Sequence, residues 1–158
     1  MAYFNDELIH VVPLLAPIDI TTSTTVSDVV NMARAHSIQF CVQFGVITDD
    51  TAVITVLECD DVSPSNSTAI AFSYRESSAV GTDSMGDRTA ATSTGVTVAA
   101  DDDGKAFYID VDASELSDGY PYIQVSVDPG SSMSVCLMSI SCMIDARYPQ
   151  ETQISAVV

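Results

Sequence analysis

The side chains that could act as an acid, a base or a nucleophile are few and scattered. The chain has only two histidines, His10 and His36, and four cysteines. It contains no GxSxG turn, no HExxH pair and no glycine-rich loop with the spacing of a phosphate cradle. An active site would therefore need a nucleophile and a base brought together from distant positions. We expect a protein that is not an enzyme, in which neither histidine is a ligand.

Carboxylates are the more abundant candidates, and they form two clusters. Residues 101–103 are all aspartate, and Asp110, Asp112, Glu115 and Asp118 lie within one short segment. Hard cations such as Ca²⁺ prefer oxygen ligands of this kind. The segment DVDASELSDG, however, lacks the central glycine and the closing glutamate of an EF-hand loop. We interpret both clusters as solvated faces and turns, and expect no metal and no cofactor.

The four cysteines, Cys41, Cys59, Cys136 and Cys142, include no CxxC pair. Cys136 and Cys142 lie six residues apart in sequence. On one strand that spacing corresponds to about 20 Å, which is far beyond the reach of a disulfide. We therefore expect buried free thiols, as is usual in a protein made in a reducing cytoplasm.

Length and charge exclude several classes of partner. A chain of 158 residues suits one domain with a real core. Its formal charge of −17 repels nucleic acid and anionic membranes. No apolar run is as long as a membrane-spanning helix. The opening MAYFNDELIHVVPLL has acids where a signal peptide carries basic residues, so we expect no secretion signal.

Short segments of alternating polarity predict strands. In SIQFCVQFGV the apolar residues Ile38, Phe40, Val42 and Phe44 alternate with Gln39, Cys41 and Gln43, as in a half-buried strand. AFYIDVD repeats the pattern, with Phe107, Ile109 and Val111 inward. Further strands are expected in AVITVLE, AIAFSYR, GVTVA, YIQVSV and MSVCLMSISCMID. We expect the turn TDDT to join SIQFCVQFGV and AVITVLE as a hairpin.

Many short strands with turns every 8–12 residues and hardly any helix indicate an all-β, antiparallel β-sandwich. The pattern leaves jelly-roll and immunoglobulin-like topologies open. We expect ASELSDGY to form one helical turn that ends before Gly119, and the loose residues 76–105 to form exposed loops. Around the sandwich, which we place at residues 26–146, we expect an N-terminal arm (1–25) and a C-terminal tail (147–158).

The strand at residues 133–145 has two apolar faces, although a surface strand usually has one. One face contains Val135 and Leu137, and the other contains Met138 and Ile140. We expect the face with Val135 in the core. The face with Met138 would then be covered by another sheet element, by the arm or by a neighbouring subunit.

Two segments resemble proteins of a known kind. VLECDDVSPSNSTAIAFSYR, residues 56–75, is similar to a strand, acidic turn and A-I-A-F-x-Y-R strand found in small structural proteins of tailed bacteriophages. YIDVDASELSDGYPYIQVSV, residues 108–127, resembles their companion motif, and ARYPQETQISAVV resembles their C-terminal tail. The likeness spans about residues 26–158. It identifies the chain as a member of the head decoration (auxiliary or cement) protein family.

This resemblance implies a structural virion protein that binds the outer face of a phage capsid. Its partners would be the major capsid protein and neighbouring copies in a homo-oligomer on the capsid lattice, with no nucleic acid and no membrane. It would be made in the host cytoplasm and located on the capsid exterior. We expect the contacts to come from apolar residues of the arm, of the strand at 133–145 and of the tail: Leu8, Ile9, Val11, Val12, Leu14, Leu15, Met138, Ile140, Tyr148, Ile154, Val157 and Val158.

The alternative is a glycan-binding β-sandwich module, as in a minor tail protein or a fibre adhesin. Such modules stack aromatic rings on sugar faces. The best pair for that purpose is Tyr120 and Tyr122, which flank Pro121. An exposed platform formed by these two rings would favour this alternative.

Overall fold

The computed structural model describes residues 9–148. Its elements are twelve strands and three short 3-10 helices: β1 (Ile9–Asp19), β2 (Thr25–Val26), β3 (Val30–Asn31), η1 (Met32–Arg34), β4 (Ala35–Thr48), β5 (Ala52–Cys59), β6 (Ser67–Ile70), β7 (Phe72–Glu76), β8 (Thr89–Ala91), β9 (Val96–Val98), η2 (Ala100–Asp102), β10 (Ala106–Asp112), η3 (Ala113–Glu115), β11 (Tyr122–Pro129) and β12 (Val135–Ala146). No helix among these residues is long and apolar enough to span a membrane.

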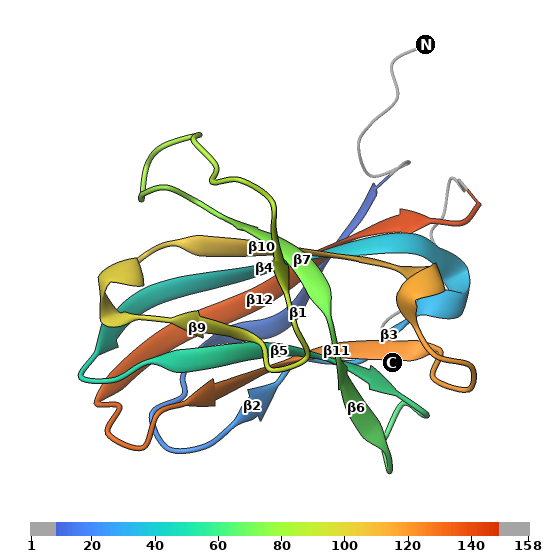
Figure 1. The fold of residues 1–158 in the computed structure, drawn as a ribbon, viewed down its shortest axis with the longest axis horizontal. Coiled ribbons are helices and arrows are strands. Elements are labelled where there is room, and N and C mark those ends of the chain that lie inside the picture. The colour runs from blue at the N-terminus through green and yellow to red at the C-terminus, as the bar shows by residue number, and fades with distance from the viewer. Residues whose placement is uncertain (1–8, 149–158) are drawn as a thin grey trace.

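The strands form two antiparallel sheets that pack face to face (Figure 1). Sheet A has the order β1-β12-β4-β10-β7-β8. Sheet B has the order β2-β11-β5-β6, and in addition β3 pairs with β11 and β9 pairs with β5. The predicted all-β sandwich is confirmed.

The pairing order distinguishes between the two topologies that the sequence left open. β1 pairs with β12, β2 and β3 pair with β11, β4 pairs with β10, and β5 pairs with β9. These nested pairs lie alternately in sheet A and sheet B, as if one long hairpin were wrapped around the core. This is the arrangement of a jelly roll. β6, β7 and β8 are an insertion between the innermost partners β5 and β9.

The predicted hairpin through TDDT is wrong, because β4 lies in sheet A and β5 in sheet B. Residues 48–51 instead connect the two layers. The predicted strand at 69–75 is likewise divided: β6 pairs with β5 in sheet B, and β7 pairs with β10 in sheet A. Figure 1 shows these two green strands crossing from one sheet to the other. Alternation of polarity reports only that one face is buried, so it cannot distinguish a hairpin from a crossover.

The core lies between the sheets and contains the inward faces predicted from alternation. Phe40, Val42, Ile109 and Val111 are fully buried. Phe44 meets Phe107 edge to face, with ring centroids 5.8 Å apart. At about 25 cal/mol per Å² of buried apolar surface, each such side chain stabilises the fold by roughly 1.5–3 kcal/mol.

The strand with two apolar faces, β12, is oriented opposite to the prediction. Met138 and Ile140 are buried in the core, with exposed fractions of 2% and 1%, whereas Leu137 is 42% exposed. The register with β4 is the reason: Met138 pairs with Phe44, and paired residues of antiparallel strands share a face. Met138 and Ile140 are therefore core residues, and the expected surface contacts at these two positions are wrong.

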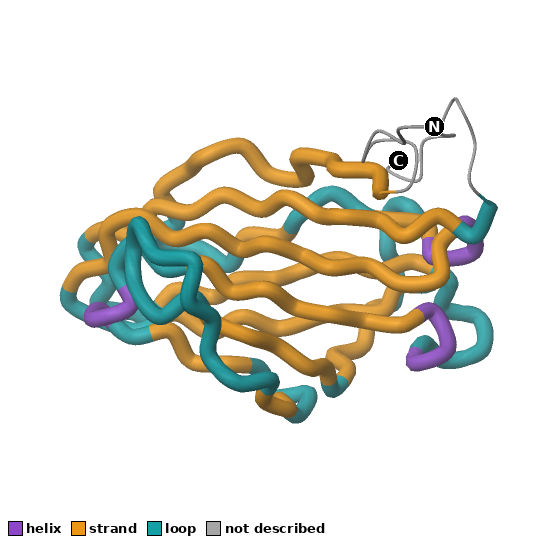
Figure 2. Tube along the Cα trace, turned by 90° about the horizontal axis from the view of Figure 1, so that it is seen from above, coloured by secondary structure: helices purple, strands orange, loops and turns teal. Residues whose placement is uncertain are grey.

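The N-terminal strand β1 has no hairpin partner next to it in the sequence, but it pairs with the last strand of the chain, β12. β1 pairs with β12 from Ile9–Asp145 to Asp19–Leu137, and Leu14 is buried in the core. Residues 9–19 are therefore an edge strand of the sandwich and not an arm around it. Because Ile9 pairs with Asp145, the described chain begins and ends at the same corner of sheet A. Figure 2 shows the long strands of this sheet running toward that corner.

The connecting segments largely agree with the predictions made from the sequence. ASELSDGY contains the helical turn η3, and Gly119 has a φ of 89°. Residues 77–95 are mostly exposed, as expected for the loose segment, although β8 lies within them. Sequence had also predicted GVTVA as a strand, and β9 confirms it.

Candidate functional site: a groove on the outer face of sheet A

The residues predicted to make partner contacts fall into four groups. Leu8, Ile154, Val157 and Val158 lie outside the described residues. Leu14, Met138 and Ile140 belong to the core. Val12 and Leu15 are partly buried and pack against it. Ile9, Val11 and Tyr148 are exposed, by 39%, 62% and 71%.

These three exposed residues belong to the same corner of sheet A. Ile9 pairs with Asp145 and Val11 pairs with Met143, so β1 and β12 present both pairs on the outer face. Tyr148 follows the end of β12. Of the contacts predicted from the sequence, Ile9 and Val11 are therefore exposed on the outer face of β1, and the exposed Tyr148 follows the end of its partner strand β12.

Beside this corner, the outer face of sheet A is hollowed into an open groove with a volume of about 430 Å³. β1, β12, β4, β10 and β7 all contribute to it, together with η3 and the loop before β8. The lining residues are Ile9, Ser37, Ile38, Gln39, Ser73, Arg88, Asp110, Val111, Asp112, Glu115, Met143 and Asp145. Ile9 and Met143 form an apolar side, and the acidic residues of β10 and η3 lie across the groove from them.

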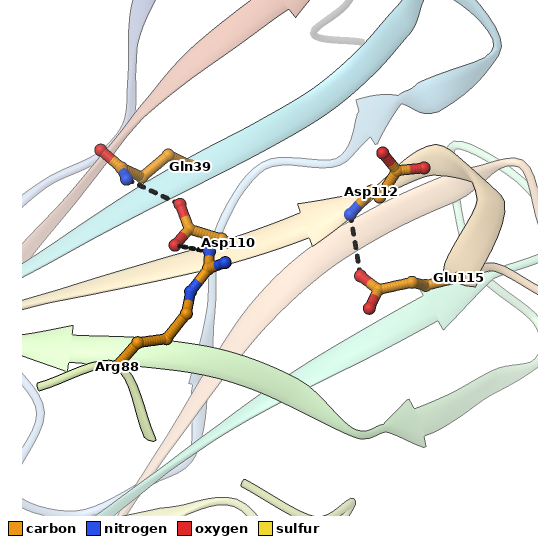
Figure 3. A network of polar contacts seen from close by, with 5 residues as sticks. All are labelled: Gln39, Arg88, Asp110, Asp112 and Glu115. Atoms are coloured by element: carbon orange, nitrogen blue, oxygen red, sulfur yellow. Dashed lines mark hydrogen bonds and ion pairs between the residues drawn. The ribbon is translucent and has the colours of Figure 1, made fainter. Parts of the chain in front are cut away.

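Asp110 is held by two partners. The Gln39 side chain donates a hydrogen bond of 2.6 Å to Asp110 Oδ1, and the Arg88 guanidinium forms an ion pair with Asp110 Oδ2. Figure 3 shows Gln39 from β4 and Arg88 from the neighbouring loop converging on this carboxylate. The pairing neutralises Asp110 and fixes Arg88, whose side chain is half exposed, at the rim of the groove.

Asp112 and Glu115 form a capping box at the start of η3. Asp112 Oδ1 accepts hydrogen bonds from the Ser114 N–H at 2.8 Å and from its hydroxyl at 2.7 Å. Glu115 Oε2 accepts from the Asp112 N–H at 2.8 Å (Figure 3). The hydrogen bonds from Ser114, with a smaller contribution from the charge of His36, lower the pKa of Asp112. The carboxylate therefore stays ionised over the whole neutral range.

The groove carries an excess of negative charge. Four carboxylates, Asp110, Asp112, Glu115 and Asp145, line it against one cation, Arg88. No aromatic ring is among the lining residues. Chemically, this arrangement suits a cation that also has an apolar portion. Asp110 and Asp112 could be placed on one outward face from alternation alone, but Gln39, Arg88 and Asp145 come from other elements and carried no signal in the sequence.

The remaining acidic cluster is structural. In the turn after β9, Asp102 accepts from the Ala99 N–H at 2.8 Å and pairs with Lys105 at 2.6 Å. Asp103 accepts from the Ile47 N–H at 2.6 Å and so ties this turn to β4. Within residues 9–148, no group of three or more histidine, cysteine, aspartate or glutamate side chains could hold a metal ion.

All four cysteines are free thiols in the described structure. Cys41 faces outward beside Tyr108 and Ser141, and burial raises its pKa despite hydrogen bonds from both neighbours, which lower it. Burial also raises the pKa of Cys59 and Cys136 to about 11 and that of Cys142 to about 12. At neutral pH these thiols are protonated and are poor nucleophiles.

Comparison of the chain with protein-family models, with curated proteins and with solved structures gives no match.

Proposed function

We propose that this chain is a structural protein of a phage virion that decorates and stabilises the outer surface of the capsid. It would act through contacts with the major capsid protein and with neighbouring copies on the lattice. It performs no chemistry in this role, because its contribution is buried surface repeated around the shell.

The observation that carries the proposal is the exposed apolar corner of sheet A. Val11 and Ile9 lie on the outer side of an edge strand, and Tyr148 lies just beyond β12. In the sequence, residues 1–8 precede Ile9 and residues 149–158 follow Tyr148, and the second of these segments ends in the apolar sequence ISAVV. Exposed apolar side chains gathered at one site are typical of a protein interface.

The topology adds support by analogy. Jelly rolls are common in viral capsid proteins, although they also occur in lectins and in enzymes. The resemblance of residues 56–75 and 108–127 to head decoration proteins points in the same direction. The charge of −17 is compatible with a position outside the shell and would be repelled by packaged DNA inside it.

The glycan-binding alternative lacks the feature it requires. Tyr120 and Tyr122 are both half-buried and do not form an exposed aromatic pair. Tyr120 lines a recess of about 250 Å³ near η3, and Tyr122 is not among the residues that line this recess. We therefore give preference to the decoration role.

Co-sedimentation with capsid shells tests the proposal. Shells of the phage that encodes this chain, assembled without it, would be mixed with the purified protein, sedimented and then heated. We expect saturable binding and a higher temperature of shell disruption. Shells that neither bind the protein nor gain heat stability would refute the proposed function.

Two matched variants test whether the corner makes the contact. Val11→Asp places a charge at the corner, and Val80→Asp places one at a similarly exposed position in the loop after β7, since the two valines are 62% and 67% exposed. We expect Val11→Asp to weaken binding about tenfold or more and Val80→Asp to have little effect. Equal effects would place the contact elsewhere on the sandwich.

A further inference from the structure

The groove on the outer face of sheet A has a chemistry that the proposed capsid role does not explain. One side is apolar, formed by Ile9 of β1 and Met143 of β12, and the other side carries Asp112 and Glu115. Asp145, at the end of β12, lies next to Ile9 in the register and brings a third exposed carboxylate to the same end of the groove.

Much of the hydrogen-bonding capacity of these acids is unused. Asp112 Oδ1 and Glu115 Oε2 serve the capping box, and the second oxygen of each has no hydrogen-bond partner in the described part of the chain. The carboxylate of Asp145 accepts no hydrogen bond from residues 9–148. Asp110, by contrast, is already neutralised by Arg88. An incoming cation would therefore meet three carboxylates with free oxygens.

The chain itself is a poor source of that cation. It has only five lysines and arginines, and two of them, Arg88 and Lys105, form ion pairs with Asp110 and Asp102. The segments 1–8 and 149–158 contain no lysine or arginine. A second copy would bring another −17 of formal charge toward the groove.

A bare metal ion is also a poor fit, because no described group of acidic, histidine or cysteine side chains has the geometry to hold one. A basic side chain suits the groove better. Lysine and arginine have an aliphatic stem that packs on apolar surface while the charged head remains at the polar side.

We propose that this groove docks a lysine- or arginine-bearing segment of another protein. The aliphatic stem lies against Ile9 and Met143, and the cation is held between Asp112, Glu115 and Asp145. The ion pair with Arg88 compensates the charge of Asp110, so this fourth carboxylate does not attract a second cation. The inference does not depend on the capsid role, because it concerns the chemistry of the segment that is bound and not the identity of the protein that carries it.

The test uses the intact protein and defined peptides. Acetylated and amidated tetralysine and tetraarginine would be titrated into the ¹⁵N-labelled chain, and amide chemical shifts would be followed at low and at physiological salt. We expect saturable shifts confined to the groove, including Gln39, Asp112 and Glu115, with binding that weakens as salt is raised.

A charge-matched pair of variants separates the groove from the general acidity of the protein. The groove variant carries Asp112→Asn, Glu115→Gln and Asp145→Asn, which keep the side-chain shapes and the capping acceptors. The control carries Asp49→Asn, Asp61→Asn and Asp83→Asn, three exposed positions outside the groove, and removes the same charge. We expect the groove variant to bind tetralysine about tenfold more weakly and the control to change less than about twofold.

Three outcomes would overturn the proposal. The first is equal weakening in both variants, or shifts spread over the whole surface, which would indicate non-specific attraction. The second is the same saturable shifts on titration with MgCl₂, which would make the groove a divalent-cation site. The third is unchanged binding in Met143→Ser, which would remove the apolar side from recognition. Because no capsid shell is used, failure here leaves the decoration proposal standing, and failure of shell binding leaves this inference standing.

Discussion

Ser27 and Val125 exchange two hydrogen bonds where the edge of sheet B is interrupted. The Ser27 N–H donates to the Val125 carbonyl at 2.9 Å, and the Val125 N–H donates to Ser27 Oγ at 3.0 Å. Ser27 lies between the two-residue strands β2 and β3, both of which pair with β11. A side-chain oxygen thus takes the place of a backbone carbonyl and keeps a buried donor of β11 satisfied.

Replacement of Ser27 by alanine should destabilise the protein through that donor. Val125 is fully buried, so its N–H would lose its partner without gaining water. We expect a loss of about 1–3 kcal/mol in the free energy of unfolding, measured by urea denaturation. Ser23→Ala, at an exposed position in the turn before β2, should be nearly neutral, and equal effects of the two substitutions would contradict this role for Ser27.

The orientation of β12 can be tested with two neighbouring residues. Met138→Ala should cost about 2–5 kcal/mol, because it leaves a cavity beside Phe44 in the core. Leu137→Ala, on the outer face, should cost less than about 1 kcal/mol. Equilibrium unfolding of the two variants gives the comparison directly, and a larger loss for Leu137→Ala would reverse the assignment of the faces.

Two glycines with nearly the same φ angle differ in the space around them. Gly95 has a φ of 87°, and a Cβ there would lie 2.2 Å from the Ile54 carbonyl oxygen. Gly119 has a φ of 89° with nothing within 4 Å. We expect Gly119→Ala to cost about 1 kcal/mol from the left-handed backbone alone. Gly95→Ala should cost about 1–3 kcal/mol more, because β5 must shift. Equal melting temperatures for the two variants would contradict the close approach at Gly95.

Asp60 should contribute to the acid sensitivity of the fold. Hydrogen bonds from the side chain and backbone of Asn66, with a further one from Ser65, lower the pKa of Asp60 from 3.8 to about 2. Because the pKa of Asp60 is lower in the folded state than in the unfolded state, its ionised form stabilises the fold at any pH above about 3.8. This stabilisation is lost as the pH falls from about 3.8 toward about 2. The stability difference between the parent protein and Asp60→Asn should therefore shrink as the pH falls through this window. Asp83→Asn, at an exposed aspartate with no hydrogen bond from the described residues, serves as the control for charge alone.

The buried thiols should be inert in the folded protein. Burial raises the pKa of Cys142 to about 12 and that of Cys59 and Cys136 to about 11, so at pH 8 they are protonated as well as inaccessible. We expect a thiol reagent such as Ellman's to react with them only after unfolding in guanidinium chloride. Cys41→Ser should leave this slow fraction unchanged. Rapid labelling of Cys142 in the native protein would contradict its burial.

The sequence determined where most strands lie and which face of β4 and β10 enters the core. In these strands one face is apolar and the other polar, and burial of a single face imposes a period of two that is visible without any knowledge of neighbours. Alternation also placed Asp110 and Asp112 on one outward face. For the same reason the sequence was sufficient for the class of fold, an antiparallel sandwich.

Only the tertiary structure decided which strands are neighbours. The partner of β1 is β12, at the other end of the chain, and β5 pairs with β11 and not with β4. On β12 both faces are apolar, so the periodic pattern was equally compatible with either face in the core. Its register with β4 selected the face that contains Met138. The groove likewise depends on residues of separate elements, such as Arg88 and Asp145, that meet only when the strands are ordered in sheet A. Strand pairing between distant segments is a property of the whole chain, because backbone hydrogen bonds are the same for every sequence and packing of side chains selects the partner.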